Sequence, residues 1–153
     1  MIFLINLIRY IYFMAKTPRF VSGRNSIYNI GYHLIWCPKY RKRILLGSFR
    51  DIVEQSLLDK SKDLNIRIEN LEIMPDHVHL FVKCTPNHRI SDIVRQLKGY
   101  SSYQVRSHYP KYRSKYKSFW SPSYYCESVG HISESTVKRY IDNQTLLSDS
   151  SRH

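Results

Sequence analysis

Acidic residues are scarce in this sequence. Its 153 residues include 12 Asp and Glu against 24 Lys and Arg, which gives a formal net charge of +12 and a pI near 9.7. No acidic residue occurs from Ile93 to Cys126, where seven Lys and Arg are interleaved with nine aromatic residues. This balance predicts a polyanionic partner, and nucleic acid is a better candidate than an anionic membrane surface. Because aromatic rings stack on unpaired bases, single-stranded nucleic acid is favoured over duplex.

Cysteines are also few. Cys37, Cys84 and Cys126 are odd in number, far apart in the sequence and without a CxxC spacing. This pattern is typical of reduced thiols in the core of a cytoplasmic protein.

A hydrophobic run long enough to cross a membrane is missing as well. The apolar residues 1–14 are interrupted by Arg9, and a transmembrane helix needs about 20 residues. A signal peptide is poorly supported, because the charged start and the small-residue cleavage site are absent. Met14 begins a more ordinary opening, MAKTPRF. We therefore expect translation to start at Met14, with the first thirteen residues an annotation artefact or a short extra helix.

No internal repeat or low-complexity tract divides the chain, and its length suits one domain. We expect an N-terminal extension over residues 1–24, a single domain over 25–147 and a tail over 148–153.

Hydrophobic periodicity predicts strands and helices in the order β-α-β-β-α-β-α. This order indicates a ferredoxin-like α+β fold, in which helices pack on one face of an antiparallel sheet and a last helix follows at the C-terminus. The predicted strands are 26–37, 66–73, 77–84 and 119–126, and the predicted helices are 49–63, one capped by Ser91, and 134–147.

Local signals refine these elements. A phase slip in the second strand predicts a bulge or turn near Asn70. Pro75 and Asp76 then form a turn into an antiparallel third strand. Pro122 marks the last strand as an edge strand, since proline cannot donate a hydrogen bond inside a sheet. Ser133 is the expected cap of the last helix.

The basic and aromatic stretch is the predicted nucleic acid surface. In the helix that follows Ser91, apolar residues form one face and basic residues the other. Three tyrosines, Tyr109, Tyr112 and Tyr116, are candidates for stacking on bases. The expected phosphate contacts are Arg95, Lys98, Arg106, Lys111, Arg113, Lys115 and Lys117.

The segment His77-Val78-His79 suggests a metal site. Successive side chains of a strand point to opposite faces, so two histidines at a spacing of two face the same way and can share one metal ion. Imidazole suits Zn, Mn, Ni and Cu.

Near the C-terminus, Tyr140 and Gln144 lie one helical turn apart and share a face. The amide carbonyl of Gln144 offers a harder oxygen ligand. A phenol beside a metal-bound phosphate can break and rejoin a nucleic acid strand without a nucleotide cofactor. Candidates for favouring the phenolate are Lys138 and Arg139, and candidates for orienting the ligands are Asp76 and Asp142.

Each signal also has a simpler interpretation. An HxH pair can arise by chance among seven histidines, and Tyr140 is one of thirteen tyrosines. The basic stretch and the two cations beside Tyr140 are compatible with an ordinary solvated surface. His33 and His131 receive no role, and we expect them in the core or on the surface.

Several motifs together resemble the HUH single-tyrosine transposases of the IS-two-hundred-like insertion sequences, from about Asn25 to Gln144. The motifs are YHLIWCPKYRKRIL at 32–45, MPDHVHLFV at 74–82, SDIVRQLKGYSS at 91–102, FWSPSYY at 119–125 and SESTVKRYIDNQ at 133–144. Their order makes the resemblance specific, whereas HVH alone would not.

The resemblance implies roles for four residues. His77, His79 and Gln144 would hold the metal, Mg or Mn, and Tyr140 would form a 5′-phosphotyrosine bond and free a 3′-hydroxyl. A similar enzyme moves its element as single-stranded DNA, recognises hairpins near the element ends, and acts as a homodimer in which one subunit's Tyr helix completes the other's HUH site.

Other functions stay open at this stage. A domesticated or catalytically silent single-stranded nucleic acid-binding protein of the same fold is the main alternative, although all four site residues are present. The small size and the absence of a helicase or of a second nucleophilic tyrosine argue against a replication or conjugation nickase. A metallohydrolase would need a base to activate water, and no well-placed Glu or second Asp is evident.

Overall fold

The computed structural model describes residues 21–22, 27–115 and 117–129. Apart from Val21 and Ser22, the predictions for the N-terminal extension, the last helix and the tail fall outside these residues.

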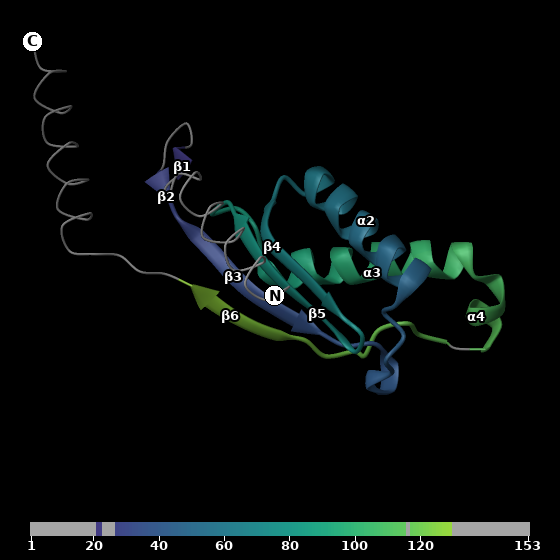
Figure 1. The fold of residues 1–153 in the computed structure, drawn as a ribbon. Coiled ribbons are helices and arrows are strands. Elements are labelled where there is room, and N and C mark those ends of the chain that lie inside the picture. The colour runs from purple at the N-terminus through teal and green to yellow at the C-terminus, as the bar shows by residue number, and fades with distance from the viewer. Residues whose placement is uncertain (1–20, 23–26, 116, 130–153) are drawn as a thin grey trace, which may run out of the picture.

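The centre of the structure is an antiparallel sheet with the strand order β4-β5-β3-β6. Helices cover one face of this sheet (Figure 1). The order and the single helical layer confirm the predicted antiparallel α+β plan. The four strands are β3 (Ile30–Trp36), β4 (Arg67–Met74), β5 (His77–Cys84) and β6 (Tyr125–Val129).

The β4–β5 hairpin forms as predicted. Its register shifts between Ile68 and Asn70, which is the expected bulge, and Met74 pairs with His77 across the short turn. The first predicted strand is divided, because β2 (Ile27–Tyr28) pairs with β1 (Val21–Ser22) in a separate two-stranded sheet.

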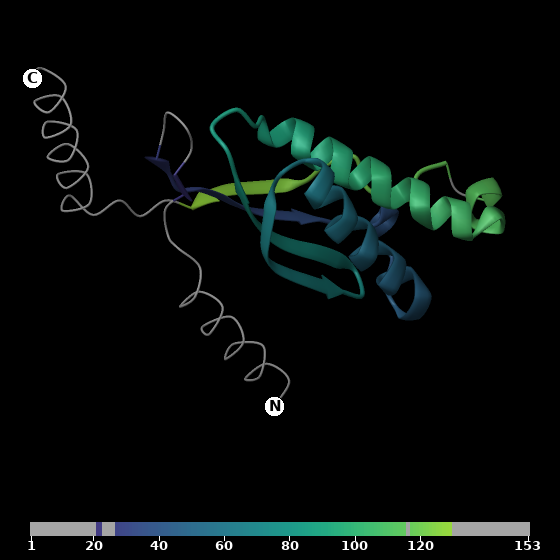
Figure 2. The ribbon, with the colours of Figure 1, turned by 90° about the horizontal axis from the view of Figure 1, so that it is seen from above.

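Two long helices, α2 (Gly47–Asp63) and α3 (Ile90–His108), lie together on the sheet (Figure 2). The helix expected over 49–63 is confirmed as α2. The prediction that Ser91 caps the next helix, α3, is wrong. Arg89 is the N-cap residue, and its carbonyl already accepts the amides of Asp92 and Ile93. Ser91 therefore lies inside the first turn.

Two further helical segments were not predicted. The basic cluster after β3 forms a 3₁₀ turn, η1 (Lys39–Arg41), and the chain after α3 forms α4 (Pro110–Lys115).

The core lies between the helices and the sheet. Along β5, the side chains of Val78, Leu80 and Val82 are fully buried, and they meet Val53 and Leu97 of the helices in the core. All three cysteines are free, as predicted; Cys84 is buried and the other two are half-buried.

The predicted strand 119–126 is placed too early. Phe119 and Trp120 are 0% and 4% exposed, so they are core residues, and Trp120 makes an isolated bridge with Pro38. Pro122 falls in the loop that follows, and β6 starts only at Tyr125. The edge position of β6 is nevertheless as expected.

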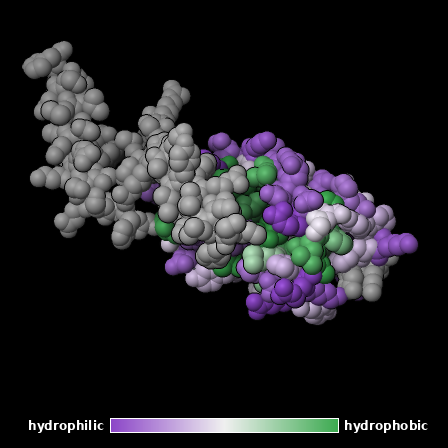
Figure 3. Space-filling view, viewed as in Figure 1, coloured by the Kyte–Doolittle hydropathy of each residue, from purple (hydrophilic) through white to green (hydrophobic). Residues whose placement is uncertain are grey.

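On the face of the molecule seen in Figure 3, the described residues show hydrophilic areas with hydrophobic patches between them. Among the described residues, no helix combines the length and the apolar character that crossing a bilayer requires.

A buried hydrogen bond ties α3 to the segment before β6. The indole Nε1 of Trp120 donates to Ser101 Oγ at 2.9 Å, and Ser101 is fully buried. We expect Ser101→Ala to lower the free energy of unfolding by about 1–3 kcal/mol, because the buried indole N–H loses its acceptor. Urea unfolding followed by circular dichroism measures this, with Ser107→Ala on the exposed side of α3 as the matched control. Equal effects of the two changes would contradict the assignment.

Candidate active site

The two histidines of the HVH segment lie on the open face of the sheet. Val78 between them is fully buried toward the helices, whereas the side chains of His77 and His79 remain about one third exposed, at 32% and 29%. In the register, His79 lies between Glu72 of β4 and Ile35 of β3. The predicted shared face is therefore confirmed.

A carboxylate holds His77. Asp76 Oδ1 lies 2.8 Å from His77 Nδ1, and Arg41 Nε donates to Asp76 Oδ2 at 3.1 Å. The hydrogen bond from His77, supported by Arg41, lowers the pKa of Asp76 although partial burial opposes the shift. The carboxylate is thus ionised at neutral pH and can only accept, which places the ring proton of His77 on Nδ1 and leaves the Nε2 lone pair available. This contact stabilises the fold above the ordinary carboxyl pKa and is lost as the pH falls through the lowered value.

The second histidine has an unexpected neighbour. His33 Nδ1 lies 3.1 Å from His79 Nε2, and the His33 ring stacks on Phe81 with a centroid distance of 4.7 Å. Burial and the neighbouring His79 lower the pKa of His33, against a smaller opposite effect of Glu127. At neutral pH, His33 is therefore an uncharged partner of His79.

Gly31 makes room for this arrangement. A Cβ atom at Gly31 would lie 2.9 Å from Phe81 Cε2, so the absence of a side chain lets the Phe81 ring cover β3. Phe81 is 4% exposed although it belongs to the open face. The ring thereby forms an apolar support beneath His33.

The donor set suits a divalent metal ion. His77 presents Nε2 with its other nitrogen held by a carboxylate, which is the usual arrangement of a metal-binding histidine. If His79 binds through Nε2, the metal replaces His33 as the partner of that nitrogen. No cluster of three or more His, Cys, Asp or Glu able to hold a metal occurs within the described part of the chain. The expected third ligand, Gln144, lies outside it.

Several other predicted site residues also lie outside the described residues. They are Tyr140, Lys138, Arg139, Asp142 and His131.

The predicted phosphate-binding residues on α3 make contacts within the chain. Lys98 Nζ donates to the carbonyls of Ser121 and Ser123 at 2.6 and 3.2 Å, and burial lowers its pKa. Arg106 Nη1 donates to the carbonyl of Lys117 at 2.9 Å. Both side chains therefore position the segment before β6 as well as supplying positive charge.

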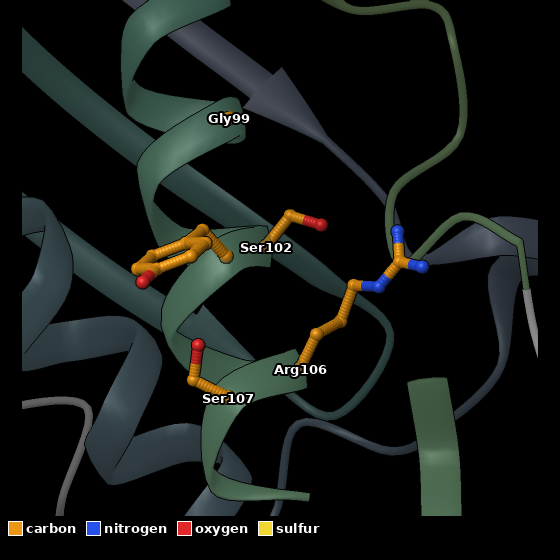
Figure 4. Close-up of a pocket in the computed structure, with 5 residues that line it drawn as sticks. Gly99, Ser102, Arg106 and Ser107 are labelled. Carbon is orange, nitrogen blue, oxygen red and sulfur yellow. The ribbon is translucent and has the colours of Figure 1, made fainter. Parts of the chain in front are cut away.

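Arg106 also borders a shallow hollow of about 280 Å³ on α3, together with Gly99, Ser102, Tyr103 and Ser107 (Figure 4). Arg95 is exposed and lies 3.5 Å from Asp92. Lys111 and Lys117 are exposed too, whereas Arg113 and Lys115 are placed only as part of α4.

The stacking prediction for Tyr109 and Tyr112 is wrong. Tyr109 stacks on Phe49 with a centroid distance of 4.4 Å, and Tyr112 meets the same ring edge-on at 5.7 Å. Both rings pack against the core, because composition alone cannot separate a core ring from a base-stacking ring. Tyr116 lies outside the described residues. Among the described residues, the exposed tyrosine rings are those of Tyr40, Tyr103, Tyr124 and Tyr125.

The family described as "Transposase IS200 like" matches residues 26–144. The chain belongs to this transposase family. The match extends over the HVH strand and over the C-terminal residues that were predicted to carry the tyrosine and the third ligand.

Two curated relatives support the same membership. This transposase is 36% identical over 125 residues to the ISDra2 transposase TnpA of Deinococcus radiodurans. The alignment covers 80% of this chain and 89% of that protein. It is 30% identical over 125 residues to the transposase for insertion sequence element IS200 of Salmonella typhimurium, covering 80% and 82%.

Solved structures share its fold. A crystal structure of a Deinococcus radiodurans protein described as a candidate transposase matches with a TM-score of 0.67 and 35% identity, covering 81% of this chain and 97% of that one. The structure of a REP-associated tyrosine transposase bound to a REP hairpin matches with a TM-score of 0.53 and 14% identity, covering 80% of this chain and 67% of that one. This likeness establishes a shared fold only.

The contact between Asp76 and His77 yields a prediction about metal affinity. We expect Asp76→Ala to weaken Mn²⁺ binding about ten- to a hundredfold, because the histidine loses the carboxylate that fixes its ring proton and orientation. Isothermal titration calorimetry measures the affinity. Asp92→Ala, which removes an exposed carboxylate beside Arg95 on α3, is the control. Unchanged Mn²⁺ affinity in the Asp76 variant would contradict the role of Asp76 in preparing His77 for the metal.

Proposed function

We propose that this transposase cuts and rejoins single-stranded DNA at the ends of its insertion sequence through a 5′-phosphotyrosine intermediate on Tyr140. The observation that carries the proposal is the pair His77 and His79 on the open face of β5, with a carboxylate on the first ring. Membership of the transposase family supports the substrate class.

The proposed reaction proceeds in two balanced steps. The Tyr140 oxygen loses its proton and attacks the scissile phosphorus, the bond from phosphorus to the 3′-oxygen breaks, and the departing strand takes up a proton as a free 3′-hydroxyl. The 5′ end stays on the tyrosine. A 3′-hydroxyl then attacks the phosphotyrosine and releases the phenol, so the energy of the broken bond is kept for rejoining.

A divalent ion, Mg or Mn, bound by His77, His79 and Gln144 would polarise the scissile phosphate. The chain's own residues prepare this site. Asp76 fixes the proton of His77 on Nδ1. Before the ion binds, His33, which stacks on Phe81, is the hydrogen-bond partner of His79 Nε2. Three neutral ligands leave the full charge of the ion for the phosphate.

The partner we propose is single-stranded DNA with hairpins near the element ends. The strong positive charge supports a DNA partner, and a protein of the same fold is bound to a REP hairpin. The basic residues predicted from the sequence, together with Lys39 and Arg41 of η1, would contact the phosphates.

The first test is the covalent adduct. Protein, Mn²⁺ and a 3′-labelled single strand from the element's end are expected to give a shifted band on a denaturing gel. Tyr140→Phe should abolish the band while leaving DNA affinity unchanged, because only the phenol oxygen is lost. Tyr103→Phe, at an exposed tyrosine of α3, is the matched control. An adduct that persists in Tyr140→Phe would overturn the role of Tyr140, and DNA binding without any adduct in the unchanged protein would favour a silent binding protein.

We further propose a homodimer in which the tyrosine of one subunit serves the HUH site of its partner. Two variants that are each inactive, His77→Ala and Tyr140→Phe, should then regain activity when mixed and allowed to exchange subunits. Each mixed dimer would contain one intact site, so adduct yield should return to about a quarter of the unchanged protein's. The adduct assay measures this, and no recovery in dimers shown to have exchanged would mean that the tyrosine acts within its own subunit.

A further inference from the structure

A second hollow lies at the end of β3, beside the histidine strand. Its volume is about 590 Å³, which falls in the usual size range of small-molecule sites. One wall is η1 with Tyr40 and Arg41, and the other is formed by Tyr124 and Tyr125 at the start of β6. This hollow is called the tyrosine groove below.

Hydrogen bonds fix the floor of the tyrosine groove. The amide of Ser121 donates to the carbonyl of Cys37, and the amide of Lys39 donates to the carbonyl of Phe119, both at 2.9 Å. Lys98 holds the carbonyls of Ser121 and Ser123 from the helix side. The two walls are thus joined to the core before any ligand binds.

The walls expose aromatic rings to solvent. Tyr40 is 78% exposed, Tyr125 54% and Tyr124 39%. Tyr40 adopts a left-handed backbone conformation with φ of 60°, which is uncommon for a residue with a bulky side chain. In this position its ring protrudes from the turn rather than packing in the core.

Positive charge surrounds the most exposed ring. Lys39 Nζ and Lys42 Nζ lie 5.6 and 5.9 Å from the centroid of the Tyr40 ring. Of the described residues that line the tyrosine groove, none is Asp or Glu. Exposed rings next to cations are the features with which proteins bind single-stranded nucleic acid, since the rings stack on bases and the cations contact phosphates.

The tyrosine groove adjoins the candidate active site. Ile35, which lines it, pairs with His79 on one side and with Tyr125 on the other. Arg41, from its opposite wall, reaches Asp76 and through it His77. A strand whose phosphate lies at the two histidines would therefore pass directly over the groove.

We propose that the tyrosine groove binds one or two unpaired bases of the DNA strand next to the phosphate that is cleaved. The bases stack on Tyr40 and Tyr125, and the cations of η1 contact the adjoining phosphates. This assignment rests on the proposed function for its place beside the cleavage site. Exposed rings beside cations favour a nucleic acid strand over an acidic peptide, because every nucleotide carries both a flat base and a charged phosphate.

Abasic substitution tests the proposal directly. Single abasic sites are introduced, one at a time, into the single strand that carries the element's end, and the affinity of each strand is measured by fluorescence anisotropy. For the unchanged protein, we expect loss of one or two bases beside the mapped cleavage position to weaken binding about tenfold, the usual effect of removing one base–aromatic stack. Tyr40→Ala should weaken binding of the intact strand by a similar factor and lose the sensitivity at those positions.

Two further variants complete the experiment. Tyr125→Ala should reproduce the effect of Tyr40→Ala. Tyr103, on α3 outside the groove, has an exposed fraction of 65%, between those of the two groove tyrosines, and Tyr103→Ala should leave the abasic profile unchanged. If both groove variants, with the circular dichroism spectrum of the folded protein, keep the normal affinity and profile, the proposal is overturned. The covalent adduct of the unchanged protein is read on the same strand. If the unchanged protein forms no adduct, the proposed function and the position of the groove beside the cleaved phosphate are both overturned. Binding of bases in the groove is then still decided by the abasic profile of Tyr40→Ala.

Discussion

The pairing of β5 with β4 on one side and β3 on the other is the constraint on which the rest of the structure depends. The helices of the described residues cover one face of the sheet (Figure 1), so the period of two along β5 buries Val78, Leu80 and Val82 and turns the histidines to the other face. A slip by one residue would exchange the two sets, placing imidazoles in the core and valines at the site. Folding and the geometry of the site are therefore specified by the same hydrogen bonds.

Several charged side chains near this strand hold neighbouring loops in place. Lys98 and Arg106 come from the helical layer, yet both donate to carbonyls of the segment that leads into β6. Asp76 links the turn after β4 to η1 through Arg41. Part of the positive charge of this transposase thus has a structural effect, because it fixes the loops that border the histidines.

Sequence patterns predicted those parts of the molecule that depend on local periodicity. The alternation in HVHLFVKC gave both the strand and the shared face of His77 and His79, and the phase slip near Asn70 gave the bulge. The contact between His33 and His79 joins residues 46 positions apart and depends on the register of β3, which no local pattern contains. The boundaries of β6 failed for a related reason, because Phe119 and Trp120 are as suitable for a core segment as for a strand.

Gly31 shows how far the site extends beyond the residues that meet a substrate. Any side chain there would press on Phe81, and Phe81 supports the imidazole beside His79. In a screen of random variants for transposition, substitutions of Gly31 should therefore reduce activity as substitutions of the site residues do, although glycine carries no reactive group. Some positions of this sheet are thus sensitive to substitution because a ring needs the space and not because they contact a substrate. A substrate-binding surface mapped from mutational sensitivity alone would therefore be too large.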